Sequence, residues 1–284
     1  MTLSVITVNY NGREHILAQL ESVRAGAGEL SIEQIVSDNG STDGSVEEIR
    51  TRFPDVKIVE NGGNIGFGAA NNSGLVLATG DYVLFLNPDM LVVPLSLPVM
   101  VKMMEQNPTI GILGPRLNNQ AGEFSPEAGP RRFPTVWNQL ATMLKVPHLF
   151  PGVLDSYLYK GFDYATGQKV DSVRGSFMLV RRELLNTLGW GFDPRYFIWF
   201  EDVDLCKEAY RHGYEVWYTA LAGAIDYVGQ SFKKQPSLTK QKWFTGSMVL
   251  YFAKWYPAWQ SMVLKIFRPL SLFLVWTQQK LAGR

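Results

Sequence analysis

The chain has 284 residues, of which 46% are hydrophobic and 19% are charged. This length and balance fit one large α/β domain with an appendage, or two modest domains, and they exclude a wholly disordered chain. One cysteine, Cys206, excludes an intramolecular disulfide, argues against a cysteine-based zinc site and favours a reducing compartment. Because the N-terminus has no basic segment and begins directly with a strand pattern, we expect no signal peptide.

The net charge of +1 conceals an uneven distribution of charge along the chain. Residues 233–284 hold nine of the 27 Lys and Arg residues, four of the eight Trp residues, and no Asp or Glu. Basic residues interleaved with Trp and Leu indicate a segment that lies on an anionic membrane surface. Its longest uncharged apolar run, residues 269–276, is far shorter than the roughly 20 residues of a membrane span. The alternative is a C-terminal helical pair that packs on the domain with solvated lysines.

The first 60 residues alternate between apolar runs and segments with helical spacing. A β-α-β-α-β pattern predicts right-handed crossovers and a parallel sheet. The predicted strands are residues 3–8, 32–37 and 56–60, and the predicted helices are residues 13–24 and 45–52.

A glycine-rich segment follows at residues 61–72, with four glycines among its first eight residues. Glycines permit close backbone approach to a ligand, and the helix that begins here could favour an anion at its N-terminus. The segment fits neither the dinucleotide-binding fingerprint nor a P-loop, since it lacks the ribose-binding acid of the first and the lysine of the second.

The apolar run at residues 82–86 ends abruptly in Asn87, Pro88 and Asp89. The run predicts a central strand that is buried on both faces, and Pro88 must end it. Asn87 and Asp89 then lie at the carboxyl end of a parallel strand, where open α/β sheets bind ligands. A carboxylate there is suited to hold Mg²⁺ or Mn²⁺ against phosphate oxygens. The alternative is a strand-ending turn with a solvated Asp.

The second half of the chain is less regular. Residues 136–168 are aromatic-rich and predict helical pieces that form an insertion over the active face. Three acids at residues 201–204 suit the first turn of a helix, because they complement its dipole. The predicted helices are residues 95–106, 183–188 and 201–212, and the predicted strands are residues 110–113, 173–182 and 215–220.

Seven short motifs occur in the order that is typical of one enzyme family, and the resemblance that they carry covers about residues 3–231. They are SVITVNYNG (4–12), SDNGSTDGS (37–45), NIGFGAANNSG (64–74), LNPD (86–89), RGSFMLVRR (174–182), GFDPRYF (191–197) and EDVDLC (201–206). Together they resemble the family 2 glycosyltransferases, which are inverting nucleotide-sugar enzymes, and especially bacterial surface-polysaccharide rhamnosyltransferases. The resemblance implies the GT-A fold, an α/β fold with a Rossmann-like, mostly parallel central sheet flanked by helices. We expect this catalytic domain at residues 1–231, with a basic, Trp-rich, amphipathic and membrane-associating helical extension at residues 232–284.

By the same resemblance, the loops after the first two strands hold the nucleotide. The carboxylate of Asp38 would accept the N3–H of uracil or thymine, which selects these bases over cytosine and purines; the alternative for Asp38 is a turn-forming residue. Arg174 is a candidate for diphosphate contact, whereas a surface ion pair is favoured for Arg181. The other residues expected around the nucleotide are Thr7, Asn9, Tyr10, Asn11, Asn64, Asn71 and Asn87.

The resemblance also implies a metal ion, Mg²⁺ or Mn²⁺, and a catalytic base. Asp89 would bind the metal, and Asp202 would be the base, with Glu201 and Asp204 as helix-start acids that orient the acceptor or the backbone. Where the family often carries His in an H-x-x-G-x-S segment, this chain has Asp226. Asp is a hard oxygen ligand, so Asp226 could bind the metal, or it could mark a different metal geometry.

The function that these expectations favour is metal-assisted, inverting transfer of a sugar from dTDP or UDP to a hydroxyl of a lipid-linked glycan. L-rhamnose from dTDP-rhamnose is the preferred donor, and a UDP-hexose is the alternative. We expect a cytoplasmic enzyme, peripheral on the inner face of the membrane. A sugar-1-phosphate nucleotidyltransferase is disfavoured, because residues 9–12 lack its Gly-rich, Arg-containing loop. A non-catalytic nucleotide-sugar-binding module is disfavoured because Asp89 and Asp202 are present, and nucleic-acid binding because the body of the chain is acidic.

Overall fold

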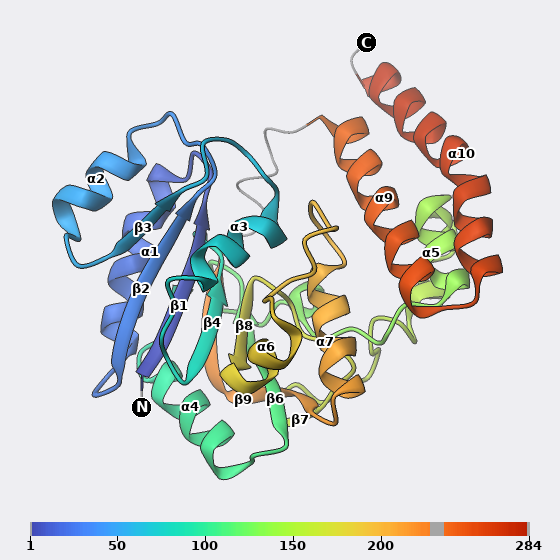
Figure 1. The fold of residues 1–284 in the computed structure, drawn as a ribbon. Helices are drawn as coiled ribbons and strands as arrows, with labels where there is room; N and C mark the ends of the chain where they lie inside the picture. The colour runs from blue at the N-terminus through green and yellow to red at the C-terminus, as the bar shows by residue number, and fades with distance from the viewer. Residues whose placement is uncertain (1, 228–235, 283–284) are drawn as a thin grey trace.

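The computed structural model describes residues 2–227 and 236–282, which fold around one sheet flanked by helices (Figure 1). The strand order is β3-β2-β1-β4-β8-β6-β9-β5, with β7 paired to β9. The strands are β1 (Thr2–Asn9), β2 (Ser31–Asp38), β3 (Lys57–Glu60), β4 (Tyr82–Leu86), β5 (Met90–Val92), β6 (Ile110–Asn118), β7 (Gln168–Lys169), β8 (Phe177–Arg181) and β9 (Glu215–Asp226). The helices are α1 (Arg13–Gly26), α2 (Ser45–Arg52), α3 (Phe67–Leu75), α4 (Ser96–Gln106), α5 (Val136–Met143), α6 (Arg182–Leu188), α7 (Glu201–Arg211), α9 (Ser237–Trp255) and α10 (Ala258–Ala282).

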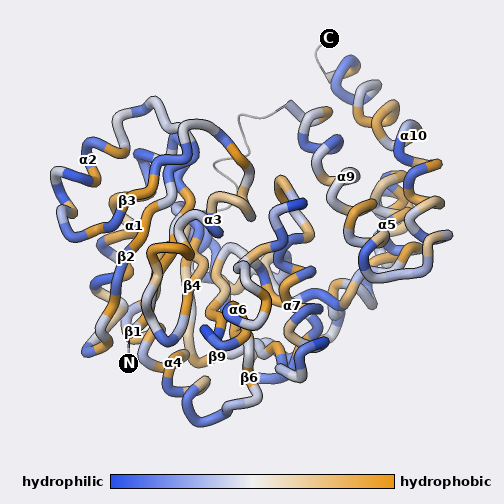
Figure 2. Tube along the Cα trace, viewed as in Figure 1, coloured by the Kyte–Doolittle hydropathy of each residue, from blue (hydrophilic) through white to orange (hydrophobic). Residues whose placement is uncertain are grey.

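Strands β3, β2, β1 and β4 are parallel, as the sequence predicts. Successive side chains of a strand point to opposite faces of the sheet, so they enter two different cores. Val5 packs with side chains of α1 and α4, whereas Ile6 packs on the other face with side chains of α3, α6 and α7. Hydrophobic stretches accordingly run along the central strands (Figure 2). This mostly parallel sheet with helices on both faces confirms the predicted fold class.

The other half of the sheet departs from the predicted strands. β8 is antiparallel to both β4 and β6, while β6 and β9 are parallel. β6 and β9 continue beyond residues 113 and 220, because their pairing resumes after an irregularity between Pro115 and Arg116. The three-residue strand β5 was not predicted. It forms because Met90–Val92 turns back immediately after Asp89 and pairs antiparallel with the end of β9.

The C-terminal helices α9 and α10 pack on each other and on α5 (Figure 1). One hydrophobic cluster joins them to the catalytic domain, since Met248, Phe252 and Leu264 share it with Tyr196 and Phe200. Within the predicted insertion at residues 136–168, α5 therefore supports these helices, whereas Tyr159, Phe162 and Tyr164 pack against the core of the sheet. In the described part of the chain, no helix is long and apolar enough to cross a membrane. The predicted domain boundary at residue 231 lies outside the described residues. The same holds for most of residues 226–231, the segment in which Asp226 stands where the family often carries His.

Candidate active site

One cleft of about 400 Å³ gathers five of the residues predicted for the site. They come from separate parts of the fold, namely the end of β4, the segment before β8, the start of α7 and the end of β9. The five residues are Asn87, Asp89, Arg174, Asp202 and Asp226. The cleft therefore lies at the carboxyl end of the central strand, where the sequence predicts it.

Strand β5 brings the two predicted metal ligands together. Met90 is the register partner of Asp226, and the backbone N–H of Tyr227 donates to the carbonyl of Asp89 at 3.0 Å. The two aspartates are only 6% and 5% exposed, and both line the cleft. Near them, the buried Oδ1 of Asn87 has no hydrogen-bond partner within the described residues. Carboxylate and amide oxygens are the ligands that Mg²⁺ and Mn²⁺ prefer, so these residues fit a hard divalent cation.

Asp202 stands apart from this pair. No group of three or more acidic, His or Cys residues within the described residues is arranged to hold a metal. A cation bound by Asp89 and Asp226 would therefore need oxygens from a ligand or water to complete its coordination. Asp202 is then available for a different task in the same cleft.

The carboxylate of Asp202 is fixed by two backbone groups. Its Oδ2 accepts from the N–H of Gly175 at 3.1 Å, and its Oδ1 accepts from the N–H of Val203 at 2.8 Å. A Cβ at position 175 would lie 3.0 Å from the Cβ of Asp202, so the glycine permits this approach. Gly175 of the RGSFMLVRR motif thus holds Asp202 of the EDVDLC motif through a backbone hydrogen bond. Lone pairs on both oxygens of Asp202 remain for a substrate hydroxyl.

The backbone in front of α7 is unusual. Trp199 and Phe200 have φ of 64° and 69°, a left-handed conformation that bulky residues seldom adopt. Both residues line the cleft, together with Glu201. Burial and the neighbouring charge of Asp202 raise the pKa of Glu201 well above its usual value. Glu201 therefore keeps its proton to higher pH than an ordinary glutamate.

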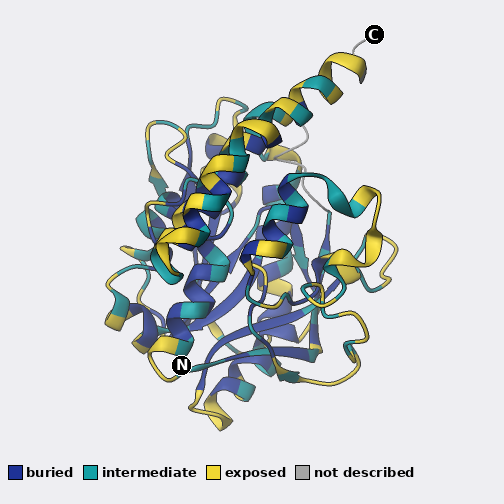
Figure 3. Ribbon diagram, turned by 90° about the vertical axis from the view of Figure 1, so that its right-hand side faces the viewer, coloured by how far each residue is buried: buried dark blue, intermediate teal, exposed yellow. Residues whose placement is uncertain are grey.

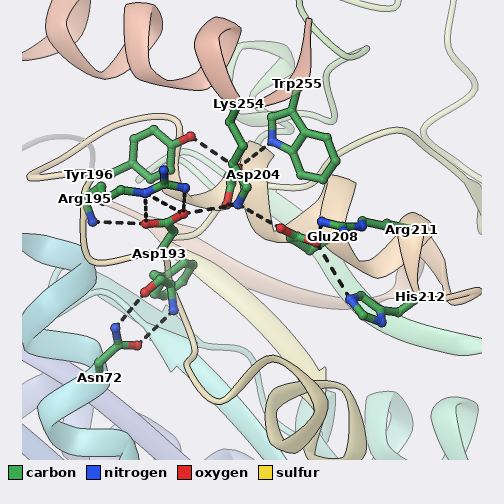
Figure 4. Close-up of polar contacts among 11 residues, drawn as sticks. Asn72, Asp193, Arg195, Tyr196, Asp204, Glu208, Arg211, His212, Lys254 and Trp255 are labelled. Carbon is green, nitrogen blue, oxygen red and sulfur yellow. Dashed lines mark hydrogen bonds and ion pairs between the residues drawn. The ribbon is translucent and has the colours of Figure 1, made fainter.

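Asp204 does not line the cleft and instead anchors helix α9 (Figure 4). It is fully buried, and it accepts from Lys254 Nζ at 2.7 Å and from Trp255 Nε1 at 2.6 Å. Lys254 also lies 3.2 Å from Asp193 Oδ2 and 2.8 Å from Glu208 Oε1. The expectation that Asp204 orients an acceptor is therefore replaced by a structural role.

Two arginines also line the cleft. Arg174, which the sequence predicts for diphosphate contact, donates through Nη2 to the carbonyl of Glu127 at 2.7 Å. Arg131, which was not predicted, also lines the cleft and donates to the carbonyls of Gly129 and Pro130 at 2.9 and 3.1 Å. Burial and the charge of Arg174 lower the pKa of Arg131. No motif marks Arg131, because its place depends on the loop at residues 126–131.

The expectation of a surface ion pair for Arg181 is wrong for the part of the chain that the structure describes, where its guanidinium bonds backbone carbonyls instead. It donates to the carbonyls of Ile110 at 3.0 Å and Met104 at 2.7 Å. It therefore ties β8 to β6 and α4.

The predicted nucleotide residues form a second group at the ends of β1 and β2. Asn9 is fully buried, and its Nδ2 donates to Asp38 Oδ1 at 2.9 Å and to two serine hydroxyls. The other oxygen of Asp38 accepts from the N–H groups of Gly40 and Ser41 at 3.0 and 2.9 Å. These bonds fix the carboxylate of Asp38 at the carboxyl edge of the sheet and leave it lone-pair capacity for one more donor.

The remaining predicted residues of this group support the loops in different ways. Asn11 has φ 51° and accepts from Thr42 N–H at 2.8 Å, while Asn64 Oδ1 accepts from Gly66 N–H at 3.0 Å. Tyr10 follows β1 directly and is half-buried. Thr7 and Asn71 are only 1% exposed and bond Gln19 and the carbonyl of Phe67. For Thr7 and Asn71 this geometry favours positioning of the loops, and direct contact with a nucleotide stays a prediction.

The glycine-rich loop lies between the two groups of residues. Gly66 has φ +93°, and a Cβ there would lie 2.6 Å from the carbonyl of Phe197. The next residue, Phe67, donates from its N–H to that carbonyl at 2.8 Å and lines the cleft. On the other side, Asn39 Nδ2 reaches Asn64 Oδ1 at 3.2 Å. The loop thus connects the Asp38 region with the cleft that holds Asp89 and Asp202.

The chain thus combines a mostly parallel α/β sheet with a cleft lined by three aspartates, which lie at the ends of β4 and β9 and at the start of α7. The family model described as Glycosyl transferase family 2 matches residues 4–189. The chain belongs to this family and is a glycosyltransferase.

Two relatives that are similar over most of this chain are named as rhamnosyltransferases. The chain is 28% identical over 247 residues to the N-acetylglucosaminyl-diphospho-decaprenol L-rhamnosyltransferase of Mycobacterium tuberculosis, which covers 83% of this chain and 79% of that relative. It is 27% identical over 230 residues to Rhamnosyltransferase WbbL of Escherichia coli K12, which covers 78% of this chain and 82% of that relative. The resemblance to rhamnosyltransferases is therefore confirmed at the level of similar proteins.

Solved structures confirm the GT-A fold. The mannosyltransferase PcManGT from Pyrobaculum calidifontis, in complex with GDP-Man and Mn²⁺, has a TM-score of 0.59 at 20% identity, over 97% of this chain and 73% of that one. GalNAc-T7 with UDP, GalNAc and Mn²⁺ has a TM-score of 0.63 at 16% identity, over 89% of this chain and 51% of that one.

Proposed function

We propose that this glycosyltransferase moves L-rhamnose from dTDP-rhamnose to a hydroxyl of a lipid-linked glycan, with inversion at the anomeric carbon. The observation that carries the reaction type is the division of the cleft between the pair Asp89 and Asp226 and the separate acid Asp202. The preference for rhamnose and for a lipid-linked acceptor rests on the relatives, one of which is named for both.

Asp202 would act as the base. Its carboxylate takes the proton of the acceptor hydroxyl as that oxygen attacks the anomeric carbon from the face opposite the diphosphate. The bond from the anomeric carbon to the diphosphate oxygen breaks, and the nucleoside diphosphate leaves with the electron pair. The backbone N–H groups of Gly175 and Val203 hold the carboxylate in one orientation during the transfer.

Asp89 and Asp226, with Asn87 in the same cleft, would hold a divalent cation, and Arg174 would contact the diphosphate. When bound, such a cation supplies charge that offsets the negative charge developing on the leaving diphosphate. Mn²⁺ is present with nucleotides or nucleotide sugars in two similar structures.

Asp38 would select the base of the nucleotide by accepting N3–H from thymine or uracil. Its carboxylate does not distinguish these two bases, so a UDP-hexose is the second candidate donor. A similar structure, Staphylococcus aureus TarS 1–349, was solved with UDP-GlcNAc, at a TM-score of 0.59. We place the enzyme in the cytoplasm, on the inner face of the membrane, where a lipid-linked acceptor would be confined.

Calorimetric titration with dTDP, UDP, GDP and CDP, each with and without Mn²⁺, tests the nucleotide site. We expect Mn²⁺-dependent binding of dTDP or UDP, and loss of that selectivity in Asp38→Asn. Asp55→Asn, at an exposed position in the α2–β3 turn, is the control and should bind as the natural chain does. Tight GDP binding, or binding that is indifferent to Mn²⁺, would contradict the proposed roles of Asp38 and Asp89.

A further inference from the structure

Helix α10 carries a stripe of large apolar side chains on its outer face. Their spacing of three, four or five residues places them along one side of the helix. Between 45% and 71% of each is exposed, and the seven residues are Trp259, Met262, Ile266, Leu270, Phe273, Trp276 and Leu281. Figure 3 shows α10 along the face of the molecule that looks at the viewer, with exposed residues along it. We call these seven residues the α10 stripe.

The opposite face of α10 is firmly packed, so the stripe is a fixed surface. Leu264 and Val275 are buried against the neighbouring helices. Ser271 is fully buried, and it donates to the carbonyl of Met143 at 3.0 Å and accepts from Gln241 at 2.7 Å. These bonds tie α10 to both α5 and α9 and prevent the helix from turning its apolar side inward.

A second set of exposed apolar side chains belongs to the segment that packs beside α10. Trp137, Leu149 and Phe150 are 66%, 78% and 66% exposed. Large exposed apolar side chains gathered on one part of a folded protein are typical of an interaction site.

The charges around the stripe indicate what kind of partner would cover it. Residues 236–282 contain five Lys, one Arg and no acidic residue. Lys242, Lys265 and Lys280 are exposed, the last two on α10 itself. A second copy of the chain would bring the same lysines against one another in a two-fold contact, without acids on the helix to offset them. An anionic lipid surface instead accepts both the apolar side chains and the cations.

We propose that the α10 stripe is the membrane-docking surface of this enzyme and lies in the headgroup region of an anionic bilayer. The two tryptophans of the stripe, Trp259 and Trp276, suit that depth, because their rings are apolar with one polar N–H. The helix lies on the bilayer and does not cross it. The docking is independent of the sugar transferred, but its use rests on the proposed lipid-linked acceptor.

Contacts inside the molecule link this surface to the cleft. Lys254 of α9 bonds Asp204 of α7, and Ser247 of α9 donates to the carbonyl of Ile198 at 2.7 Å. Ile198 lines the cleft, three residues from the start of α7. Docking through α10 therefore sets the orientation of the cleft relative to the bilayer, so acceptor and base meet in a restricted geometry.

Vesicle co-sedimentation of the full chain tests the proposal. The probes are vesicles of phosphatidylcholine alone and of phosphatidylcholine with phosphatidylglycerol. We expect binding to the anionic vesicles that weakens at high salt, and a loss of about tenfold or more in Ile266→Ser/Phe273→Ser. Lys265→Gln/Lys280→Gln should weaken binding to the anionic vesicles but not to the phosphatidylcholine vesicles. The control Val76→Ser/Leu221→Ser removes two apolar residues that are 83% and 77% exposed elsewhere, and it should bind normally.

Equal binding of Ile266→Ser/Phe273→Ser and the natural chain would overturn the proposal, as would no binding to anionic vesicles. A dimer in light scattering that Ile266→Ser/Phe273→Ser converts to a monomer would also overturn it, in favour of a second copy. Nucleotide titration of the same variants separates this surface from the proposed function. We expect unchanged nucleotide affinity, whereas failure of the chemistry would appear as absent nucleotide binding with vesicle binding intact.

Discussion

At the scale of single residues, the site depends on side chains and glycines that hold the acids in place. Asn9 fixes Asp38, and the absence of a side chain at Gly175 lets its N–H reach Asp202. Such residues do not touch the reacting atoms, yet they determine where the reactive oxygens lie. Displacement of a catalytic group by a fraction of an ångström lowers a rate, because reaction needs near-ideal geometry.

Gly175→Ala tests this dependence directly. The added Cβ would lie 3.0 Å from Asp202 Cβ, so the carboxylate must shift by a few tenths of an ångström. We expect kcat to fall about tenfold with little change in the nucleotide KM. In Gly167→Ala the nearest contact of the added Cβ is an ordinary 3.4 Å, so this control should keep its activity. An unchanged kcat in Gly175→Ala would show that Asp202 does not depend on this contact.

Glu33 provides a residue-scale prediction for stability and pH. Burial alone would raise its pKa, but hydrogen bonds from Lys57, Ser4 and Thr79 lower it from 4.5 to about 2. The folded pKa lies below the unfolded pKa, so the charged form stabilises the fold above about pH 4.5, and this stability is lost as the pH falls towards about 2.

We therefore expect Glu33→Gln to lower the free energy of unfolding by about 2 kcal/mol at pH 7. The difference from the natural chain should shrink as the pH falls below about 4.5. Urea denaturation at several pH values measures both effects, with Glu29→Gln at an exposed position as control. A difference at pH 7 that persists unchanged near pH 2 is the contrary result.

At the scale of elements, β5 and α9 bring together side chains that the central parallel strands alone leave apart. β5 joins Asp89 to Asp226, which are 137 positions apart in the sequence, and α9 inserts Lys254 among three buried acids of the sheet domain. Both arrangements depend on long-range pairing.

If β5 and β9 assemble a metal site, the two aspartates should act together. Asp226→Asn and Asp89→Asn should each reduce the gain in dTDP or UDP affinity on addition of Mn²⁺ by about tenfold or more. Affinity without Mn²⁺ should change little. Titration of each variant against nucleotide with and without Mn²⁺ measures this. If Asp226→Asn keeps the full effect of Mn²⁺, Asp226 is not a ligand.

Removal of the Lys254 amine should destabilise the whole chain. Asp193, Asp204 and Glu208 are at most 4% exposed and would lose their shared cation. We expect Lys254→Met to lower the free energy of unfolding by about 3–5 kcal/mol. Guanidinium denaturation measures the change, and Lys242→Met, at an exposed position of α9, should stay within about 0.5 kcal/mol of the natural chain. If Lys254→Met is as stable as Lys242→Met, the contacts of Lys254 with the three acids do not anchor α9.

The elements that the sequence predicts well are those with local signals. The strands around residues 3–8, 32–37 and 82–86 carry apolar runs, and the helices between them carry a clear period, so β1 to α3 match the prediction. β5 has three residues after a Pro-Asp turn and no local pattern, so only its pairing with β9 reveals it. Arg131 was likewise missed, because an irregular loop places it in the cleft.

At the scale of the whole molecule, the cleft and the α10 stripe are parts of one packed body. The C-terminal helices share a hydrophobic cluster with Tyr196 and Phe200, which flank the loop in front of Asp202. A charge pattern in the sequence indicated a basic, Trp-rich extension, but it did not show that Lys254 is buried in the catalytic domain or that one face of α10 is left apolar. Those features depend on which residues each helix turns inward.

The central claim is that Asp202 removes the acceptor proton in a cleft where Asp89 and Asp226 hold the donor's metal. The most direct measurement compares Asp202→Asn with the natural chain, in transfer rate with the donor that titration selects and in nucleotide affinity with Mn²⁺. We predict a fall in kcat of about 10²–10⁴-fold with nucleotide affinity unchanged, because the amide cannot accept the proton. A transfer rate close to that of the natural chain would contradict the assignment of Asp202 as the base.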